Sequence, residues 1–327
     1  MKILGICNKI IEFSFYGIFF LVPLVFSSST SELFEFNKMW LTFGLTILIL
    51  SAWIIKMVVL KKFWIQKTPL DIPIVIFLVS LIISTIFSWD IHVSVWGYYS
   101  RFNGGLLSIF SYIILYYALA SNFSLARGDA SGDVRRRASS LSSGSLEGAP
   151  LDERAAGPRL IDLIKRILVT SLFSGTIVAL WGLPSHFGYD PTCFLFRGSL
   201  DVSCWTEDFQ PKLRIFSTLG QPAWLGAYLA ILSPLVLALF LNSKRRLFAF
   251  CFLLLSVLFY VDILFTKSRA ALIAFWISIA CFVFSYYLID VRKKVKKISL
   301  KNVFAYTKPL LLILAIFLIA TAVVMSP

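Results

Sequence analysis

Four cationic side chains stand beside small residues in otherwise apolar parts of this sequence: Arg101, Arg214, Lys267 and Arg269. A guanidinium group binds phosphate through two parallel hydrogen bonds, and an ammonium group adds a compact positive charge. A charged side chain at the centre of a bilayer costs at least about 2.5 kcal/mol, so such residues lie at a surface or are held by a partner. If the four side chains converge, we expect them to bind a polyanion such as a diphosphate.

The composition indicates a membrane protein. The 327 residues are 58% hydrophobic and only 15% charged, whereas soluble chains are usually ~45–50% apolar and ~25% charged. Because a helix needs about 20 apolar residues to cross a bilayer, we predict an all-α, polytopic protein with about nine transmembrane helices. The predicted spans are 10–28, 39–60, 72–88, 104–120, 163–182, 222–241, 247–266, 270–289 and 308–325. The length of the first favours a span over a cleaved signal peptide.

The distribution of cations predicts the orientation. With the N-terminus in the cytoplasm and the C-terminus outside, most of the 31 Lys and Arg residues fall in cytoplasmic segments, as positive-inside bias requires. We therefore expect a multi-pass protein of the cytoplasmic (inner) membrane. This topology accounts for the net charge of +14, and a nucleic-acid partner is not expected. The exceptions are Lys38, Arg101, Arg197, Lys212, Arg214, Lys267 and Arg269.

On this topology the four cations lie at the outer mouths of three helical hairpins. A diphosphate on a lipid carrier is the anion expected at that depth. Tyr98 and Tyr99 could stack on a sugar or anchor at the headgroups, and Gly220 would let the backbone approach a ligand. The competing interpretation is that these cations snorkel to ordinary membrane lipids.

Three other residues suggest local structure. Asp262 lies about one helical turn before Lys267, so we expect an ion pair, with a proton relay as the alternative. Cys193 and Cys204 both fall in the predicted outer loop, where a disulfide is possible. No cysteine or histidine spacing matches a metal site, and we expect neither a metal nor another cofactor.

The chain divides in three by composition. Residues 1–125 form a membrane domain with four spans, and residues 161–327 form a second with five spans and an outer loop at 183–221. Residues 126–160 are rich in Ser, Gly and Ala and contain no aromatic residue. Such a segment cannot bury enough apolar area to offset chain entropy, so we predict a disordered cytoplasmic loop.

Several stretches resemble a known family. They are ELFEFNKMWL (32–41), TPLDIPIVIF (68–77), STIFSWD with GYYSRFNGGLLS (84–108), RIFSTLGQPAWLGAYLAILSPLVLAL (214–239) and FTKSRAAL (265–272). In this order they resemble the O-antigen ligase and polymerase superfamily. The resemblance implies a GT-C-like membrane glycosyltransferase that moves a glycan from undecaprenyl diphosphate to an acceptor lipid, polymer or protein at the outer face of the membrane. It implies that Arg101, Arg214 and Arg269 bind the diphosphate without a metal.

Two departures qualify the resemblance. The family usually reads Asn-Pro-Asn where this chain has Gln221-Pro222-Ala223. The family's catalytic histidine lies in a large external loop expected beyond Pro327, so the catalytic base is unknown here, and neither His92 nor His186 inherits that role. The expected function is O-antigen ligase-like glycan transfer; a transporter or flippase of lipid-linked glycan and an inactive truncated remnant are the alternatives.

Overall fold

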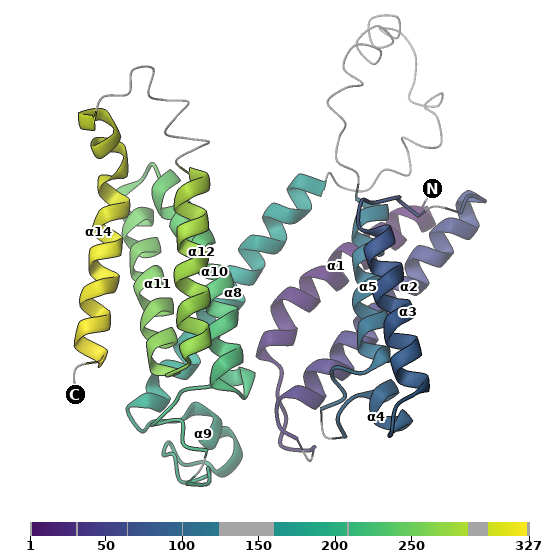
Figure 1. Ribbon diagram of the computed structural model, residues 1–327, viewed down its shortest axis with the longest axis horizontal. Coiled ribbons are helices and arrows are strands. Elements are labelled where there is room, and N and C mark those ends of the chain that lie inside the picture. The colour runs from purple at the N-terminus through teal and green to yellow at the C-terminus, as the bar shows by residue number, and fades with distance from the viewer. Residues whose placement is uncertain are drawn as a thin grey trace, which may run out of the picture. The chain divides into compact units, whose positions relative to one another are not determined.

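The computed structural model describes residues 2–30, 32–63, 65–99, 101–123, 160–207, 209–286 and 300–325. All regular secondary structure in these ranges is helical (Figure 1). The helices are α1 (Lys2–Leu24), α2 (Glu35–Leu60), α3 (Asp71–Ile86), α4 (Ile91–Trp96), α5 (Leu106–Asn122), α8 (Leu160–His186), α9 (Pro191–Arg197), the 3₁₀ helix η3 (Ser217–Leu219), α10 (Pro222–Asn242), α11 (Arg246–Phe265), α12 (Arg269–Tyr286) and α14 (Leu300–Met325).

The helices have the lengths and compositions of membrane spans. Six are long and apolar enough to cross a bilayer, namely α1, α2, α8, α10, α11 and α12. Three shorter apolar helices accompany them, at Asp71–Ile86, Leu106–Asn122 and Leu310–Val323. Lipid cannot form hydrogen bonds with backbone N–H and C=O groups, whereas a helix pairs these groups with one another. The chain is thus a helical membrane protein, and each predicted span overlaps one of these helices.

The chain forms two compact units. Unit 1 comprises Met1–Val22 and Thr30–Thr170, and unit 2 comprises Pro23–Ser29 and Ser171–Pro327. The predicted disordered loop at 126–160 lies outside the described residues, apart from Leu160 at the start of α8.

Unit 1 has its core where α1, α2 and α5 meet. Ile11 of α1 and Ile49 of α2 are fully buried there, and Ala118 of α5 packs in the same cluster. One cation enters this core, because Lys56 is only 7% exposed. Its Nζ donates to Asn8 Oδ1 at 2.9 Å and to Asn122 Oδ1 at 3.2 Å. Burial removes the water that would hydrogen-bond to this ammonium group, and the two neutral amides accept those hydrogen bonds instead.

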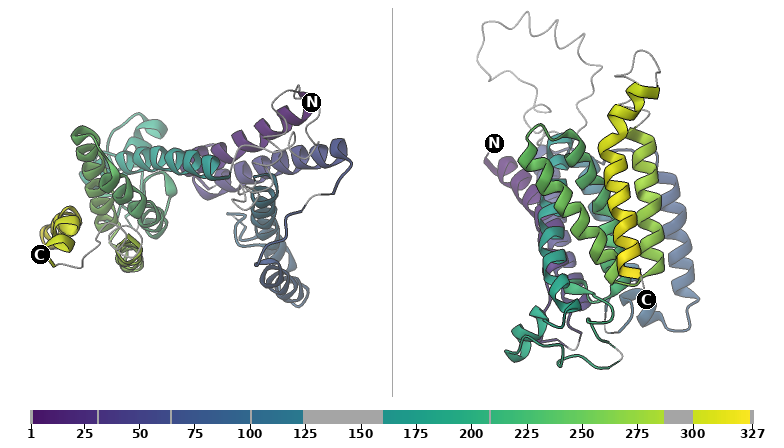
Figure 2. Two further views of the ribbon diagram at one scale, coloured as in Figure 1. Left: turned by 90° about the horizontal axis from the view of Figure 1, so that it is seen from above. Right: turned by 90° about the vertical axis from the view of Figure 1, so that its left-hand side faces the viewer.

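Unit 2 is built around α10, which packs along both α11 and α12, while α14 packs along α11. The helices lie side by side in both views of Figure 2. Gly226 permits a close approach of α10 to α12, because a Cβ atom there would collide with Cβ of Ala271 on α12. The same Cβ atom would contact Oγ1 of Thr266 at 3.4 Å. Tyr260, Phe275 and Phe317 fill the space between α11, α12 and α14.

The two ends of unit 2 carry different structures. One end holds α9, the turn between α11 and α12, and the C-terminal end of α14 (Figure 1). The other end holds the turn between α10 and α11, with Lys244, Arg245 and Arg246. The predicted outer loop at 183–221 is partly helical, because α8 continues to His186 and the segment includes α9 and η3.

Candidate functional site

The turn between α11 and α12 displays two of the predicted cations. Lys267 adopts a left-handed backbone conformation with φ of 49°. Thr266 Oγ1 donates to the carbonyl of Ile263 at 2.7 Å, and Ser268 Oγ accepts from the amide of Ala271 at 3.4 Å. These bonds satisfy backbone groups at the two helix ends. Lys267 and Arg269 are both exposed on either side of Ser268.

Arg214 joins this turn from another part of the chain. Its Nε donates to the carbonyl oxygen of Thr266 at 3.0 Å, and the amide of Ile215 donates to the carbonyl of Phe265 at 3.3 Å. Arg214 is exposed, whereas Ile215 is fully buried. The structure therefore gathers Arg214, Lys267 and Arg269 around one turn, and we call these three residues the turn cluster.

The acidic side chains of the described residues do not offset the charge of the turn cluster. Among the described residues, none of its three members has a carboxylate within ion-pair distance. Exposed cations that share one small area repel one another, so a bound anion relieves that repulsion. Arginine and lysine side chains of this kind suit phosphate oxygens in particular.

His186 lies next to the turn cluster, a placement that the sequence did not predict. Its ring stacks on Phe265 with centroids 3.8 Å apart and an interplanar angle of 16°. Its Nδ1 is buried without a hydrogen-bond partner among the described residues. No periodic signal in the sequence relates position 186 to position 265, because the contact depends on where α8 ends.

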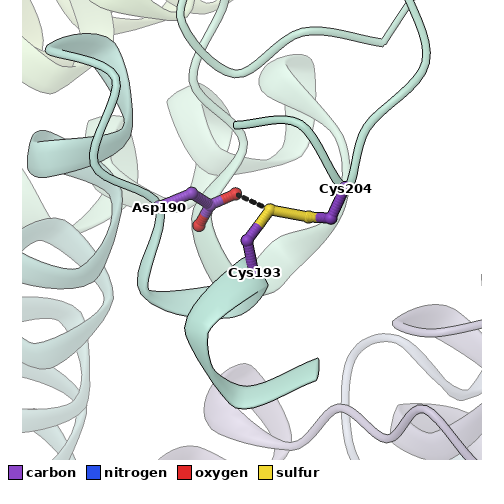
Figure 3. A group of neighbouring side chains, drawn as sticks. All are labelled: Asp190, Cys193 and Cys204. Carbon is purple, nitrogen blue, oxygen red and sulfur yellow. Dashed lines mark hydrogen bonds between the residues drawn. A yellow bond between two sulfur atoms is a disulfide. The ribbon is translucent and has the colours of Figure 1, made fainter. Parts of the chain in front are cut away.

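A disulfide fixes the segment between α8 and α10. Cys193 and Cys204 are bonded, with Cα atoms 5.7 Å apart, and Asp190 lies against Cys193 Sγ at 3.8 Å (Figure 3). The carboxylate of Asp190 accepts from the amide of Thr192 at 2.9 Å and caps α9. Asp190, Cys193 and Cys204 are close enough to share a metal ion, but sulfur atoms joined to each other are not available as thiolate ligands.

Aromatic contacts link this disulfide-bonded segment to Arg214. Asp190 also accepts from the indole N–H of Trp205. The Trp205 ring packs edge-on against Phe216 at 5.0 Å, and Phe209 stacks on Phe216 at 4.4 Å. Phe216 is buried and follows Ile215 directly, so these rings hold the chain where Arg214 reaches Thr266.

Gly220 shapes the approach to α10. It ends η3 in the left-handed conformation with φ of 79°. Nearby, Thr218 Oγ1 donates to the carbonyl of Pro23 at 2.8 Å, while Gln221 makes no side-chain capping bond to α10. The described contacts thus give Gly220 a conformational role.

Arg101 belongs to unit 1 and has an acidic partner. Its Nε lies 3.3 Å from Oε1 of Glu35, at the start of α2. The Arg101 side chain is 46% exposed, and its guanidinium carbon lies 5.8 Å from the centre of the exposed Tyr98 ring. Of the four predicted cations, the structure groups the three in unit 2 and pairs Arg101 with Glu35.

The loop that contains Arg101 begins at Gly97 and ends at Gly105, and its two ends are in contact. Gly97 has φ of 93°, and a Cβ atom on Gly105 would collide with the backbone of Gly97. Tyr99 donates from Oη to Oδ2 of Asp90 at 3.2 Å, and the amide of Val93 donates to Oδ1 of Asp90 at 3.1 Å. The bonds from Val93 and Tyr99 lower the pKa of Asp90, and the same carboxylate raises the pKa of Tyr99.

The predicted ion pair between Asp262 and Lys267 is wrong. Asp262 is fully buried and neither of its carboxyl oxygens has a hydrogen-bond partner among the described residues, whereas Lys267 is exposed. Five residues along a helix correspond to a rotation of roughly 140°, and α11 ends at Phe265. The side chain of Lys267 therefore leaves the helix in another direction.

No protein-family model, curated protein or solved structure matches this chain. The geometry and chemistry of the residues themselves consequently carry the functional argument.

Proposed function

We propose that this chain binds a glycan linked to undecaprenyl diphosphate at the turn cluster and acts as an O-antigen ligase-like glycosyltransferase. The proposed architecture is a GT-C-like protein with about nine spans, in the cytoplasmic membrane. Its N-terminus lies inside and its C-terminus outside. The acceptor is a lipid, a polymer or a protein at the outer face.

The observation that carries the proposal is the grouping of Arg214, Lys267 and Arg269 around one turn without an acidic partner among the described residues. The hydrogen bond to Thr266 uses Arg214 Nε and leaves the two terminal nitrogens of that guanidinium group for a ligand. A diphosphate has oxygens enough to engage all three cations. The turn cluster lies at the opposite end of unit 2 from the basic run at 244–246, as the proposed topology requires.

The same cations suit the chemistry of transfer. An acceptor hydroxyl attacks the anomeric carbon of the sugar, a new C–O bond forms, and the bond to the diphosphate breaks with its electron pair. Negative charge develops on the departing diphosphate, and prearranged cations stabilise that charge. The acceptor proton passes to a base, and we assign that role to no described residue.

Arg101 has a different expected role in this proposal. Because Glu35 already pairs with Arg101, the Arg101 guanidinium can bind phosphate only by sharing or leaving that carboxylate. Tyr98 and Tyr99 are exposed beside it, so this loop better suits the sugar portion of a ligand than the diphosphate.

Binding of undecaprenyl diphosphate to the protein in nanodiscs tests the proposal. Arg214→Ala, Lys267→Ala and Arg269→Ala should each lower the affinity by about tenfold or more, since a hydrogen bond to a charged group contributes about 1.5–3 kcal/mol. Lys244→Ala and Arg245→Ala remove cations at the opposite end of unit 2 and serve as matched controls. Unchanged affinity in all three turn-cluster variants would refute the diphosphate assignment.

Transport of lipid-linked glycan is the second candidate. Buried ionisable groups within spans are typical of transport pathways, and Lys56 and Asp262 are both buried in apolar helices. Proteoliposomes that contain labelled lipid-linked glycan separate the two functions. Movement of the label between leaflets without an acceptor would favour transport, and covalent transfer to an acceptor would favour the ligase.

A further inference from the structure

Asp262 is a buried acid for which the described residues offer no compensating group. It lies in α11 with 0% exposure, and both carboxyl oxygens are buried without a hydrogen-bond partner among the described residues. An ionised carboxylate in such a place would lose its hydration without gaining any hydrogen bond or ion pair. A proton or a bound cation must therefore balance the charge of this group.

The neighbouring helix α10 supplies no charge. Gly226 of α10 faces Thr266, so in this antiparallel pair Asp262 lies level with Ala230, one turn further along each helix. Helix α10 contains no Asp, Glu, Lys, Arg or His. Its one tyrosine, Tyr228, donates from Oη to the carbonyl of Ser171 at 3.3 Å.

Among the described residues, the other packed elements supply no nearby charge either. On α12, Arg269 is exposed at the first residue and Cys281 is exposed further along. The described side chains of α14, at 310–323, are uncharged, and Tyr260 of α11 hydrogen-bonds to Thr321 there. At the turn, Lys212, Arg214 and Lys267 are exposed, and the nearby His186 ring stacks on Phe265.

The surroundings favour a proton over a metal cation as the group that balances Asp262. A cation such as Na⁺ or Ca²⁺ needs several oxygen ligands. Two carbonyls at this level of α10 already accept hydrogen bonds, Ala230 from Ser278 Oγ at 3.1 Å and Leu229 from Ser233 Oγ at 2.7 Å. A proton needs only one carboxyl oxygen and leaves a neutral group in an apolar core.

We propose that Asp262 is a proton-binding site within unit 2, held as a neutral carboxylic acid one helical turn from the turn cluster. Such an acid, in an apolar environment, is the substrate of hydrophobic carbodiimides. The acid proton passes to a carbodiimide nitrogen while the carboxyl oxygen adds to the central carbon. Migration of the acyl group to nitrogen then gives a stable N-acylurea, with no group lost.

Treatment of the whole chain in nanodiscs with dicyclohexylcarbodiimide, followed by peptide mass spectrometry, tests the proposal. The peptide that contains α11 should gain the mass of one carbodiimide, and Asp262→Asn should abolish that gain. Asp201→Asn is the matched control, because Asp201 is exposed and hydrogen bonds from Ser203 lower its pKa; it should leave the labelling of α11 unchanged.

Two outcomes would overturn the proposal. One is an α11 peptide that stays unlabelled in a wild-type chain whose infrared spectrum also lacks the band of a neutral Asp262. The other is labelling that sodium chloride suppresses and choline chloride does not, which would mean that the carboxylate holds a sodium ion. Neither outcome depends on diphosphate binding, so the proposed function can fail while this inference stands, and the reverse also holds.

Infrared spectroscopy gives a second, label-free measurement. Asparagine has nearly the same shape as a neutral aspartic acid, so Asp262→Asn should fold. The difference spectrum between wild type and Asp262→Asn should show loss of the carbonyl stretch of a neutral carboxylic acid. Loss of carboxylate bands instead would show that Asp262 is ionised and would contradict the proposal.

Discussion

Nε of Arg214 donates a hydrogen bond to the carbonyl oxygen of Thr266 at 3.0 Å, which ties the segment after the disulfide-bonded loop to the turn between α11 and α12. The bond does two things. It satisfies a carbonyl at the end of α11, and it orients the remaining guanidinium nitrogens beside Lys267 and Arg269. Position of the guanidinium group, in addition to its charge, should therefore matter for binding.

Arg214→Lys separates charge from position. Lysine keeps the positive charge but has no N–H group where Nε of arginine stands. Loss of one hydrogen bond costs about 1 kcal/mol, so the affinity for undecaprenyl diphosphate should fall roughly fivefold. Titration in nanodiscs, with Arg214→Gln as the variant without charge, measures this. Equal affinity of Arg214→Lys and wild type would mean that charge alone acts.

Gly226→Ala should destabilise unit 2. The new methyl group would collide with Ala271 on α12 and press on Thr266. Overpacking of this kind costs about 1–3 kcal/mol. Thermal unfolding in detergent should show a lower midpoint for Gly226→Ala. Gly44→Ala is the control, because apart from its chain neighbours and its own helix backbone no atom lies within 4 Å of that Cβ position. A similar loss there would mean that glycine at position 226 has no special packing role.

The sequence predicted the helices better than the contacts between them. Apolar segments of sufficient length reveal helices because lipid leaves a spanning backbone few alternatives. Helix ends were less predictable: α8 runs past the predicted end at 182 to His186, and α1 begins at Lys2. The prediction located helices by their apolar residues, so it could not detect helical turns that polar residues form at the ends.

The candidate site was predictable in part for the same reason. The predicted spans define the turns that join them, so Lys267 and Arg269, which lie in one short turn, were expected near each other. The hydrogen bond from Arg214 to Thr266 and the pairing of Arg101 with Glu35 depend on the paths of loops. Those contacts join residues far apart in the sequence, and no periodic pattern encodes them.

The loop beside Arg101 should loosen in acid. Hydrogen bonds from Val93 and Tyr99 lower the pKa of Asp90, so the folded state favours the ionised carboxylate. The resulting stabilisation is present above the pKa of an unfolded aspartate and is lost as pH falls through the lowered pKa. Hydrogen exchange at the amide of Val93 should therefore accelerate at low pH. In Asp90→Asn, the exchange rate of the Val93 amide should not change with pH once intrinsic exchange is corrected for. If the acceleration seen in the wild type persists in Asp90→Asn, the assignment to Asp90 is contradicted.

Asn8 and Asn122 should contribute to the stability of unit 1, because they accept hydrogen bonds from the buried ammonium group of Lys56. Removal of Asn8 by Asn8→Ala leaves the ammonium with one of its two described bonds, to Asn122. A hydrogen bond to a charged group contributes about 1.5–3 kcal/mol, so the free energy of unfolding should fall by roughly that amount. Lys56→Met keeps most of the volume and removes the charge, so it should be nearly neutral or stabilising, as replacement of buried ionic groups by apolar ones often is.

A double-mutant cycle tests this reasoning about Lys56. In the Lys56→Met background, Asn8→Ala should cost much less than in the wild type, because no charge remains to be solvated. The free energy of unfolding in detergent gives the coupling between the two residues. If Asn8→Ala has the same effect in both backgrounds, then Asn8 acts through packing against α2 and not through its hydrogen bond to Lys56.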